Sequence, residues 1–471
     1  MTAARSGVTW RPADAATLTG MWMRTTPLIE LYRSTEHGTV VDRPAEGRFR
    51  VPLNGPLPDG LTEVIIPSTI DTTCGWYDGG DRTVLLTQIP EAYWGEPMLL
   101  MQEGDTVRRA YATGEHTFVR EDGETFALPG PDFQRSRRFR ESAVEFEAGG
   151  VRLAGSLITP AGPGPFPAAV MLHGSSGGQR DYQRLYATTI LAAGVAVLMY
   201  DKRGHGRSGG TEDPTIFDQA DAADAALDLL ARTPGIGKRG LIGFSNGMWA
   251  APMVAGRRTD VAFVAGVGSP GVSMAECEIH RRTKVLRDSG VGPQTLALVE
   301  AFWRCVFRMA AMGAAGDDDV DKLVDLTARL AKADDLDRYE IPDYVRQNPM
   351  LAPYPPPDVP AEAIAAMVTA DASPELAYAP AVYYARLNCP VFLQWGSNDV
   401  SVPVPASVEA VSAALPSATL RVYEGVEHQL NLPPRAMAGL SLEEVQYLFH
   451  DFRFAAGVRE DMTAWLRAAV S

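Results

Sequence analysis

Hydrophobic and polar positions follow two different patterns along the 471 residues of the chain. Residues 1–141 begin with an expected short helix over Ala13–Tyr32 and continue as short β-type runs between turn residues. A hairpin is expected around Glu121–Glu124. We therefore expect a β-rich accessory domain over residues 1–141, which ends in the polar, Arg-rich connection Gly130–Arg140. The expected strands are Arg48–Leu53, Thr62–Ile66, Arg82–Gln88, Met98–Met101 and His116–Arg120.

From Ser142 onward, strongly apolar runs alternate with helical patterns. Ala168–Leu172 and Val195–Tyr200 are fully apolar apart from the tyrosine, whereas Asp218–Arg232 has apolar residues on one helical face. Continuous apolar strands that alternate with helices are typical of a parallel sheet covered on both faces. The pattern predicts an α/β domain over residues 142–471. Its other expected elements are an opening hairpin (Ala143–Phe146, Val151–Thr159), strands at Val261–Val267, Cys389–Trp395 and Ala418–Tyr423, and a closing helix at Arg459–Ala469.

The alternation is interrupted between about residues 270 and 386. This section holds helical patterns over Leu296–Ala311 and Val320–Ala333 and a Pro-rich turn, Asn348–Pro357. We expect a helical cap inserted between two strands of the sheet. Its apolar and aromatic side chains either wall an acyl pocket or bury their own helix, and both interpretations stay open. These side chains are Phe302, Trp303, Phe307, Met309 and Met312.

Composition excludes several classes of partner. The formal net charge of −15 argues against nucleic acid and anionic membranes, because both bind clustered Lys and Arg. The four cysteines form no C-x-x-C pair, so we expect reduced, mostly buried thiols rather than a metal site or a disulfide framework. The N-terminus has no apolar signal-peptide core, and no apolar run reaches about 18 residues. A soluble, cytoplasmic protein is expected.

Gly243-Phe244-Ser245-Asn246-Gly247 is the stretch with the clearest chemistry. An apolar run precedes this G-x-S-x-G pattern and a helix-compatible run follows it, which is the context of a nucleophile elbow. Glycines two residues on either side of the serine let the strand and the helix approach closely. An ordinary Gly-rich turn would give the same five residues, so the remaining chain must supply partners for Ser245.

A serine nucleophile needs a histidine base that an acid orients, and in this architecture they follow the serine as acid and then base. Of the downstream histidines, His428 lies just beyond the last expected strand, whereas His280 lies in the expected cap and His450 in a helix-like segment. Asp399 lies in the loop after Cys389–Trp395. The alternative for Asp399 is a turn aspartate that binds its own backbone. We predict a triad of Ser245, Asp399 and His428.

An oxyanion hole requires two N–H donors. The first is the backbone N–H of Asn246, the residue after the nucleophile. The second comes from the Gly-rich loop Leu172–Gly178, where Ser175 is our choice and Gly174 and Ser176 are alternatives. His173 in this loop is interpreted as structural.

Together these motifs resemble the α/β-hydrolase superfamily. Leu172-His-Gly, Asp201-x-Arg-Gly-x-Gly-x-Ser208, the elbow, Gly396-x-x-Asp399 and His428 occur in the order of that superfamily, over residues 142–471. The resemblance is closest to bacterial serine esterases and to the related acyl-peptidase and dienelactone-hydrolase branches, and it implies the same triad. The long helical section departs from the pattern. The β-rich N-terminal region is similar to one that some esterases of this group carry. A serine in place of cysteine argues against a dienelactone hydrolase.

The expected function is a serine esterase-type hydrolase that cleaves a carboxylic ester or related acyl bond through an acyl-enzyme. It requires no metal and no organic cofactor. The expected partner is a small-molecule ester or acyl substrate, with no nucleic acid and no membrane, and a homodimer is left open. Alternatives are an acyltransferase with the same triad, a peptidase, and a non-catalytic binding protein on this fold.

Overall fold

The computed structural model describes most of the chain from residue 70 onward. The expected helix over Ala13–Tyr32 and His450 lie outside the described residues, as does most of the Pro-rich turn Asn348–Pro357. The described residues are 48–49, 64–65, 70–89, 98–120, 122–175, 178–210, 215–316, 318–339, 353–354, 359–370, 372–432 and 452–471.

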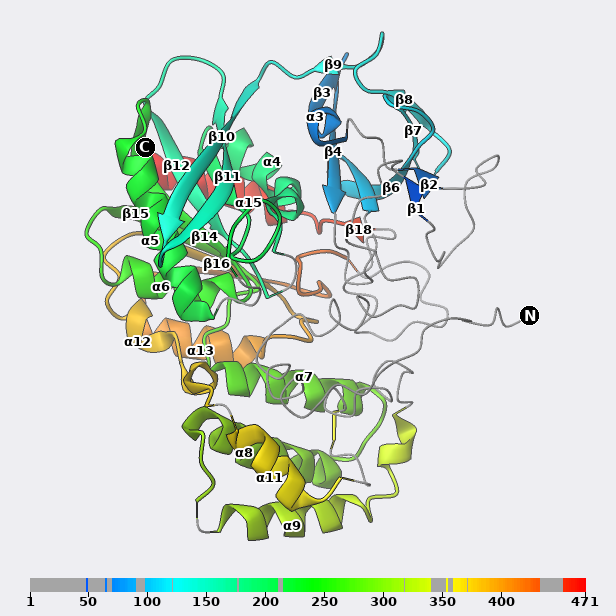
Figure 1. The fold of residues 1–471 in the computed structure, drawn as a ribbon, viewed down its shortest axis with the longest axis vertical. Coiled ribbons are helices and arrows are strands. Elements are labelled where there is room, and N and C mark those ends of the chain that lie inside the picture. The colour runs from blue at the N-terminus through cyan, green and yellow to red at the C-terminus, as the bar shows by residue number, and fades with distance from the viewer. Residues whose placement is uncertain are drawn as a thin grey trace.

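An eight-stranded sheet forms the centre of the part of the chain that the structure describes (Figure 1). The order of its strands is β10-β11-β13-β12-β14-β15-β16-β17. β10, β11 and β13 pair antiparallel, and every pair from β13 to β17 is parallel. The strands span Phe139–Ala148 (β10), Val151–Pro160 (β11), Phe166–Leu172 (β12), Ala196–Tyr200 (β13), Ile236–Phe244 (β14), Val261–Val267 (β15), Val391–Gly396 (β16) and Thr419–Tyr423 (β17).

Two helical layers explain why the central strands are apolar at every position. In β13, Ala196, Leu198 and Tyr200 belong to one hydrophobic cluster, whereas Val197 and Met199 belong to another. Successive side chains of a strand point to opposite faces, so a strand covered on both faces has no polar side. One cluster includes helices α5 and α6, and the other includes α4 and α15. These helices span Arg184–Ala192 (α4), Ile216–Arg232 (α5), Gly247–Ala255 (α6) and Val458–Val470 (α15).

A second, antiparallel sheet gathers the strands before residue 136 and one strand from the C-terminal segment. Its main path is β1-β2-β6-β5-β4-β3-β9, and β7 and β8 form the expected hairpin beside β6. β18 also pairs with β6, so the C-terminal segment takes part in the N-terminal sheet. The strands span Arg48–Phe49 (β1), Val64–Ile65 (β2), Gly75–Gly79 (β3), Arg82–Ile89 (β4), Met98–Glu103 (β5), Thr106–Ala112 (β6), Thr117–Arg120 (β7), Thr125–Ala127 (β8), Gln134–Arg135 (β9) and Phe452–Arg453 (β18). A short helix, α3 (Ile70–Thr73), precedes β3.

Hydrogen bonds from its arginines hold the connection between the two sheets in place. β9 pairs with β3, and β10 already begins at Phe139 as part of the large sheet. The expected boundary between residues 141 and 142 therefore lies inside β10. Arg138 donates to Asp78 Oδ1 at 2.6 Å and Arg135 to Thr73 O at 3.1 Å. The polar composition of this connection thus reflects binding to the N-terminal sheet.

A helical insertion lies between β15 and β16, at one end of the sheet (Figure 1). Four of the five side chains discussed above are buried within it, because Phe302, Trp303, Phe307 and Met309 are at most 2% exposed. The rings of Trp303 and Phe307 stack at 5.4 Å, whereas Met312 is 62% exposed. These four side chains form the core of the insertion, as the second of the two interpretations expects. Its helices span Met274–Asp288 (α7), Pro293–Met312 (α8), Asp319–Leu330 (α9), Ala361–Thr369 (α11) and Ala381–Tyr384 (α12).

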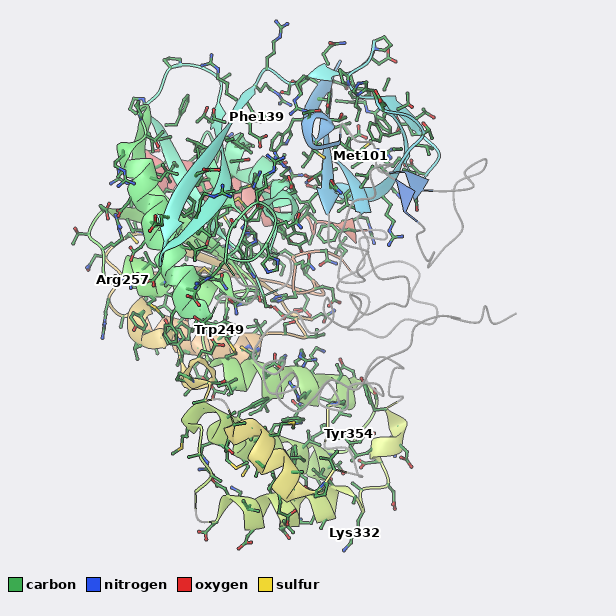
Figure 2. The ribbon with its side chains drawn as sticks, viewed as in Figure 1. Met101, Phe139, Trp249, Arg257, Lys332 and Tyr354 are labelled. Atoms are coloured by element: carbon green, nitrogen blue, oxygen red, sulfur yellow. The ribbon has the colours of Figure 1, made fainter. Side chains whose placement is uncertain are left out.

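Trp249 on α6 connects the sheet to this insertion. It lies where the two parts meet in Figure 2, and its Nε1 donates to Val272 O at 3.0 Å.

All four cysteines are free, and three of them are buried. Over the described ranges, none of the helices combines the length and the apolar character that crossing a membrane requires.

Candidate active site

Ser245 lies in the turn between β14 and α6. Its backbone φ is 47°, in the left-handed region that residues other than glycine rarely adopt. Its N–H donates to Val267 O, and its carbonyl accepts from Met248 N, both at 2.8 Å. These bonds attach the turn to β15 on one side and to the first turn of α6 on the other. The strained conformation is therefore held by the surrounding structure.

The two glycines of the motif allow the close packing around this turn. A Cβ on Gly247 would lie 2.8 Å from the carbonyl oxygens of Leu172 and His173, at the end of β12. A Cβ on Gly243 would lie 2.5 Å from the sulfur of Met248. Both separations are too short for a side chain. The motif thus has the strand, sharp turn and helix that a nucleophile elbow requires.

Asp399 lies in the loop after β16 and is fixed by its own backbone. Its Oδ1 accepts from the N–H groups of Ser401 and Val402, both at 2.8 Å, which is the local turn considered as an alternative. Its Oδ2 lies 2.7 Å from His428 Nδ1, so the carboxylate also binds the imidazole. The side chain of Asp399 is fully buried. One carboxylate therefore holds both its loop and the histidine.

His428 lies in the loop after β17, and α13 (Val404–Ala414) together with β17 separates it from Asp399. A Cβ on Gly268 would lie 2.7 Å from Cε1 and 2.9 Å from Nδ1 of His428, so the imidazole lies directly against this glycine. Gly268 follows Val267, whose carbonyl binds the N–H of Ser245. The structure thus brings the His428–Asp399 pair and the elbow together around the end of β15.

The charges around His428 favour its protonated form. Burial alone would lower the pKa of the imidazole, but the adjacent Asp399 carboxylate, its hydrogen bond and the charge of Glu427 raise that pKa above its usual value. Burial raises the pKa of the neighbouring Glu427 carboxyl to about 7. With Asp399 ionised, Nδ1 of His428 must donate, which leaves Nε2 as the proton acceptor.

The loop after β12 lies beside Ser245. A Cβ on Gly174 would lie 3.6 Å from Ser245 Cβ, which is ordinary contact distance, and Ser175 is the next residue. Asn246 stands at the N-terminus of α6, where backbone N–H groups have no partner within the helix. Its side-chain Oδ1 accepts from Gln219 Nε2 on α5. Asn246 is therefore part of the elbow itself, and Ser175 directly follows the residue that lies against Ser245.

Two other histidines have structural contacts. His280 on α7 donates from Nε2 to the carbonyl oxygen of Asp399 at 3.1 Å, and burial lowers its pKa. His173 Nε2 contacts Tyr200 O at the end of β13. His280 thus joins the helical insertion to the loop that holds the acid. Within the described ranges, no three His, Cys, Asp or Glu side chains form a group that could hold a metal ion.

The family model described as "Alpha/beta hydrolase family" matches residues 169–440, which is more than half of the chain. The chain belongs to the alpha/beta hydrolase family. This assignment agrees with the strand order of the large sheet and with the resemblance seen in the motifs. The hydrolase carries, in addition to that fold, the helical insertion and the N-terminal sheet.

Several solved structures are similar to this hydrolase at low identity. The Pyrococcus furiosus esterase Pf2001 is 19% identical, with 62% of this chain and 83% of that chain covered and a TM-score of 0.37. Est1E from Butyrivibrio proteoclasticus with bound ferulic acid is 17% identical, with 70% and 98% covered and a TM-score of 0.38. Proline iminopeptidase from Mycobacterium smegmatis is 17% identical, with 70% and 100% covered and a TM-score of 0.39. At these scores none of them indicates a substrate. A search of curated proteins found no match.

Four residues around the site of this hydrolase had no role in the sequence-based prediction of the site. They are Lys202, Gln219, Gly268 and His280, whose contacts join segments far apart in the chain. Two of them had a sequence signal: Lys202 stands between the two charged residues of the Asp201-x-Arg203 motif, and His280 was one of the downstream histidines considered as the base.

Proposed function

We propose that this hydrolase is a serine esterase that cleaves a carboxylic ester or related acyl bond of a small molecule. The observation that carries the proposal is the strained elbow at Ser245, next to a buried His428–Asp399 pair with a 2.7 Å hydrogen bond. A serine hydroxyl is a weak nucleophile until a neighbouring base accepts its proton. A buried histidine whose Nδ1 is bound to a carboxylate supplies that base.

In the proposed acylation step, Nε2 of His428 takes the proton of Ser245 Oγ as the oxygen attacks the carbonyl carbon. Asp399 stabilises the imidazolium that forms and keeps its orientation. The carbonyl oxygen becomes an oxyanion, which accepts from the backbone N–H groups of Asn246 and Ser175. Collapse of this intermediate expels the alcohol, which receives the proton from His428.

In the proposed deacylation step, a water molecule replaces the alcohol. His428 removes a proton from the water, which attacks the acyl-enzyme carbonyl, and the same two N–H groups stabilise the second oxyanion. Collapse releases the carboxylic acid and returns the proton to Ser245 Oγ. Every proton transfer uses one imidazole nitrogen, so the proposal depends on His428 keeping Nε2 unprotonated in the resting enzyme.

A panel of p-nitrophenyl esters of increasing acyl length tests the proposal. We expect Ser245→Ala to lower kcat by at least about 10³-fold, as loss of a serine nucleophile does in related chemistry. Ser412→Ala, an exposed position on α13, is the matched control and should keep full activity. Full activity in Ser245→Ala would refute the mechanism. If the acyl group is transferred to added alcohols or amines in preference to water, the enzyme is an acyltransferase rather than a hydrolase.

A further inference from the structure

Lys202 is the second residue after β13 and is almost completely buried, with 5% of its surface exposed. Its Nζ donates to the carbonyl oxygen of Gly174 at 2.6 Å and lies 3.3 Å from that of Ser175. Its backbone N–H donates to Gly178 O at 2.7 Å. One residue therefore binds both sides of the loop that follows β12. The ammonium group is directed at carbonyl oxygens of the segment next to the nucleophile.

The peptide group that Lys202 binds is the one that carries the proposed second oxyanion donor. The carbonyl of Gly174 and the N–H of Ser175 belong to the same peptide unit, which is trans. In a trans peptide the C=O and N–H bonds point in opposite directions. An ammonium group on the oxygen side therefore fixes the N–H on the other side. A hydrogen bond from a charged donor also polarises the peptide and makes its N–H a stronger donor.

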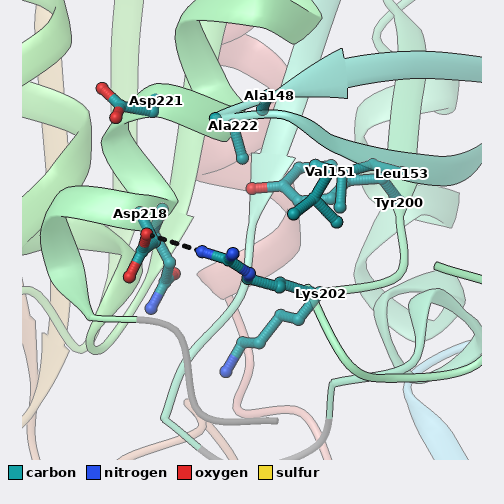
Figure 3. A pocket seen from close by; sticks show the side chains of 11 residues that line it. Ala148, Val151, Leu153, Tyr200, Lys202, Asp218, Asp221 and Ala222 are labelled. Atoms are coloured by element: carbon teal, nitrogen blue, oxygen red, sulfur yellow. Dashed lines mark hydrogen bonds and ion pairs between the residues drawn. The ribbon is translucent and has the colours of Figure 1, made fainter. Parts of the chain in front are cut away.

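The position of Lys202 is itself fixed by its neighbours. Asp201 Oδ1 accepts from the N–H of Arg180 at 2.9 Å, and Oδ2 accepts from the N–H of Arg207 at the same distance. The side chain of Lys202 leaves the strand end next to a small pocket that Tyr200 and Asp218 also line (Figure 3). The backbone is thus held at the point where the side chain begins, and the burial of that side chain restricts the rotamers open to it.

We propose that Lys202 is a positioning residue of the oxyanion hole. Its ammonium group orients and polarises the Gly174–Ser175 peptide, so that the N–H of Ser175 points at the developing oxyanion before the substrate binds. This inference rests on the proposed function. Lys202 touches neither substrate nor reacting atoms and acts through the peptide alone. A lysine that merely held the loop in place would affect all substrates equally, whereas this role affects reactions that develop charge on oxygen.

The test compares Lys202→Met with the wild type on an ester and on the matching thionoester. In the thionoester the charge develops on sulfur, a larger and weaker hydrogen-bond acceptor, so the oxyanion donors contribute less. We expect Lys202→Met to lower kcat for the ester by about 10- to 100-fold with a nearly unchanged KM, somewhat less than the loss of a donor itself. The ester-to-thionoester ratio of kcat should fall by about the same factor.

Two variants serve as comparisons. Lys202→Arg keeps the charge and should recover part of the ester activity. Lys238 is an exposed residue near the start of β14 and also donates to backbone oxygens, those of Val470 and Ser471. Lys238→Met removes this lysine, which is far from the loop after β12 in the sequence. It should leave the ratio unchanged. Because both rates are measured on one sample, the ratio does not depend on the fraction of folded protein.

An equal loss with both substrates, or no loss with either, would overturn the role of Lys202. The proposed function is tested separately by Ser245→Ala in the same assay. If Ser245→Ala stays active, the proposed function fails. If Ser245→Ala is inactive but the Lys202→Met ratio equals that of the wild type, the inference about Lys202 fails and the proposed function stands.

Discussion

The two oxygens of the Asp399 carboxylate have separate functions in the site. Oδ1 fixes the loop through two backbone N–H groups, and Oδ2 fixes the imidazole of His428. An asparagine could still accept the two N–H bonds through its single oxygen. Its amide nitrogen would then face His428 Nδ1 as a donor, and Nδ1 could bind it only as an acceptor. The ring would have to carry its proton on Nε2, which is the wrong tautomer for a base.

We therefore predict that Asp399→Asn lowers kcat by about 10³- to 10⁴-fold while the protein stays folded. The pH profile gives a second readout. Only the neutral imidazole accepts a proton, so kcat/KM of the wild type should fall as the pH drops through a His428 pKa above 6.5. Without the carboxylate, burial lowers the pKa of the imidazole and only the charge of Glu427 still opposes it, so the pKa should be lower than in the wild type. The fall of kcat/KM on the acid side of the pH profile should therefore occur at lower pH in Asp399→Asn than in the wild type.

The pH dependence of kcat/KM for both proteins checks this prediction. Asp260→Asn, at an ion pair with Arg258 near the start of β15, is the control and should keep the wild-type profile. An acid limb that stays at the same pH in Asp399→Asn would mean that another group controls activity. Full activity in Asp399→Asn would show that Asp399 is not the acid that orients His428.

At the scale of elements, the elbow depends on three segments that meet without side chains between them. The end of β12 packs on Gly247 in the first turn of α6, while β14 delivers Ser245 to the turn. The backbone of Ser245 is strained, and this contact region leaves it no room to relax. The precision of the nucleophile therefore depends on how closely β12 and α6 approach.

We predict that Gly247→Ala destabilises the protein by about 1–3 kcal/mol and lowers kcat, because its Cβ would separate β12 from α6. The control is Gly237→Ala on β14, the strand that precedes the elbow, where a Cβ would find its nearest neighbour at 3.5 Å. It should leave kcat unchanged and cost at most a small part of that stability. Urea unfolding and ester kinetics measure both effects. Equal effects of the two substitutions would contradict the packing argument.

The elements that could be predicted from sequence are those whose pattern is local. β12 and β13 are apolar throughout, and the G-x-S-x-G pentapeptide marks its own turn. β6 has two arginines among its seven residues, so no apolar run marks it. β3 contains glycine and aspartate, which are typical of turns, and forms a strand because β4 and β9 pair with it. Tertiary pairing decides such segments.

The same distinction applies to the candidate site. Ser245, Asp399 and His428 lie at strand ends in a known order, so the motifs and spacing were enough to propose them. The contacts of Lys202 with Gly174 and of Gly268 with His428 join loops that only the fold brings together. A single sequence has no signal for such pairs. For that reason the supporting residues around the site could be found only from coordinates.

At the scale of the whole molecule, the N-terminal sheet and the hydrolase fold share one hydrophobic cluster. This cluster contains Trp76 and Leu85 of the N-terminal sheet and Leu185 and Tyr186 of α4. The C-terminal segment crosses between the two parts, because β18 pairs with β6 and the following helix α15 packs on α4. Since neither part buries this surface alone, we expect them to unfold together.

Trp76 is the side chain that tests this coupling most directly. It is 4% exposed, its Nε1 donates to Thr188 Oγ1 at 3.1 Å, and its ring packs edge-on against Phe139 at 5.4 Å. We predict that Trp76→Ala lowers the free energy of unfolding by about 3–5 kcal/mol, as large buried aromatic deletions do. Because the cavity opens between the two parts, hydrogen exchange should become faster in β4–β6 and also in β12–β14.

Hydrogen–deuterium exchange of peptides from both sheets, with urea unfolding of the same samples, measures this effect. Phe217→Ala is the matched control: this aromatic side chain on α5 is 42% exposed and lies away from the shared cluster. Removing it should cost less than about 1 kcal/mol, because an exposed ring contributes little burial. Faster exchange confined to the N-terminal sheet of Trp76→Ala would show two independently folding domains. A uniform change in both sheets would mean that the N-terminal sheet supports the layer of α4 and α15 behind the candidate site.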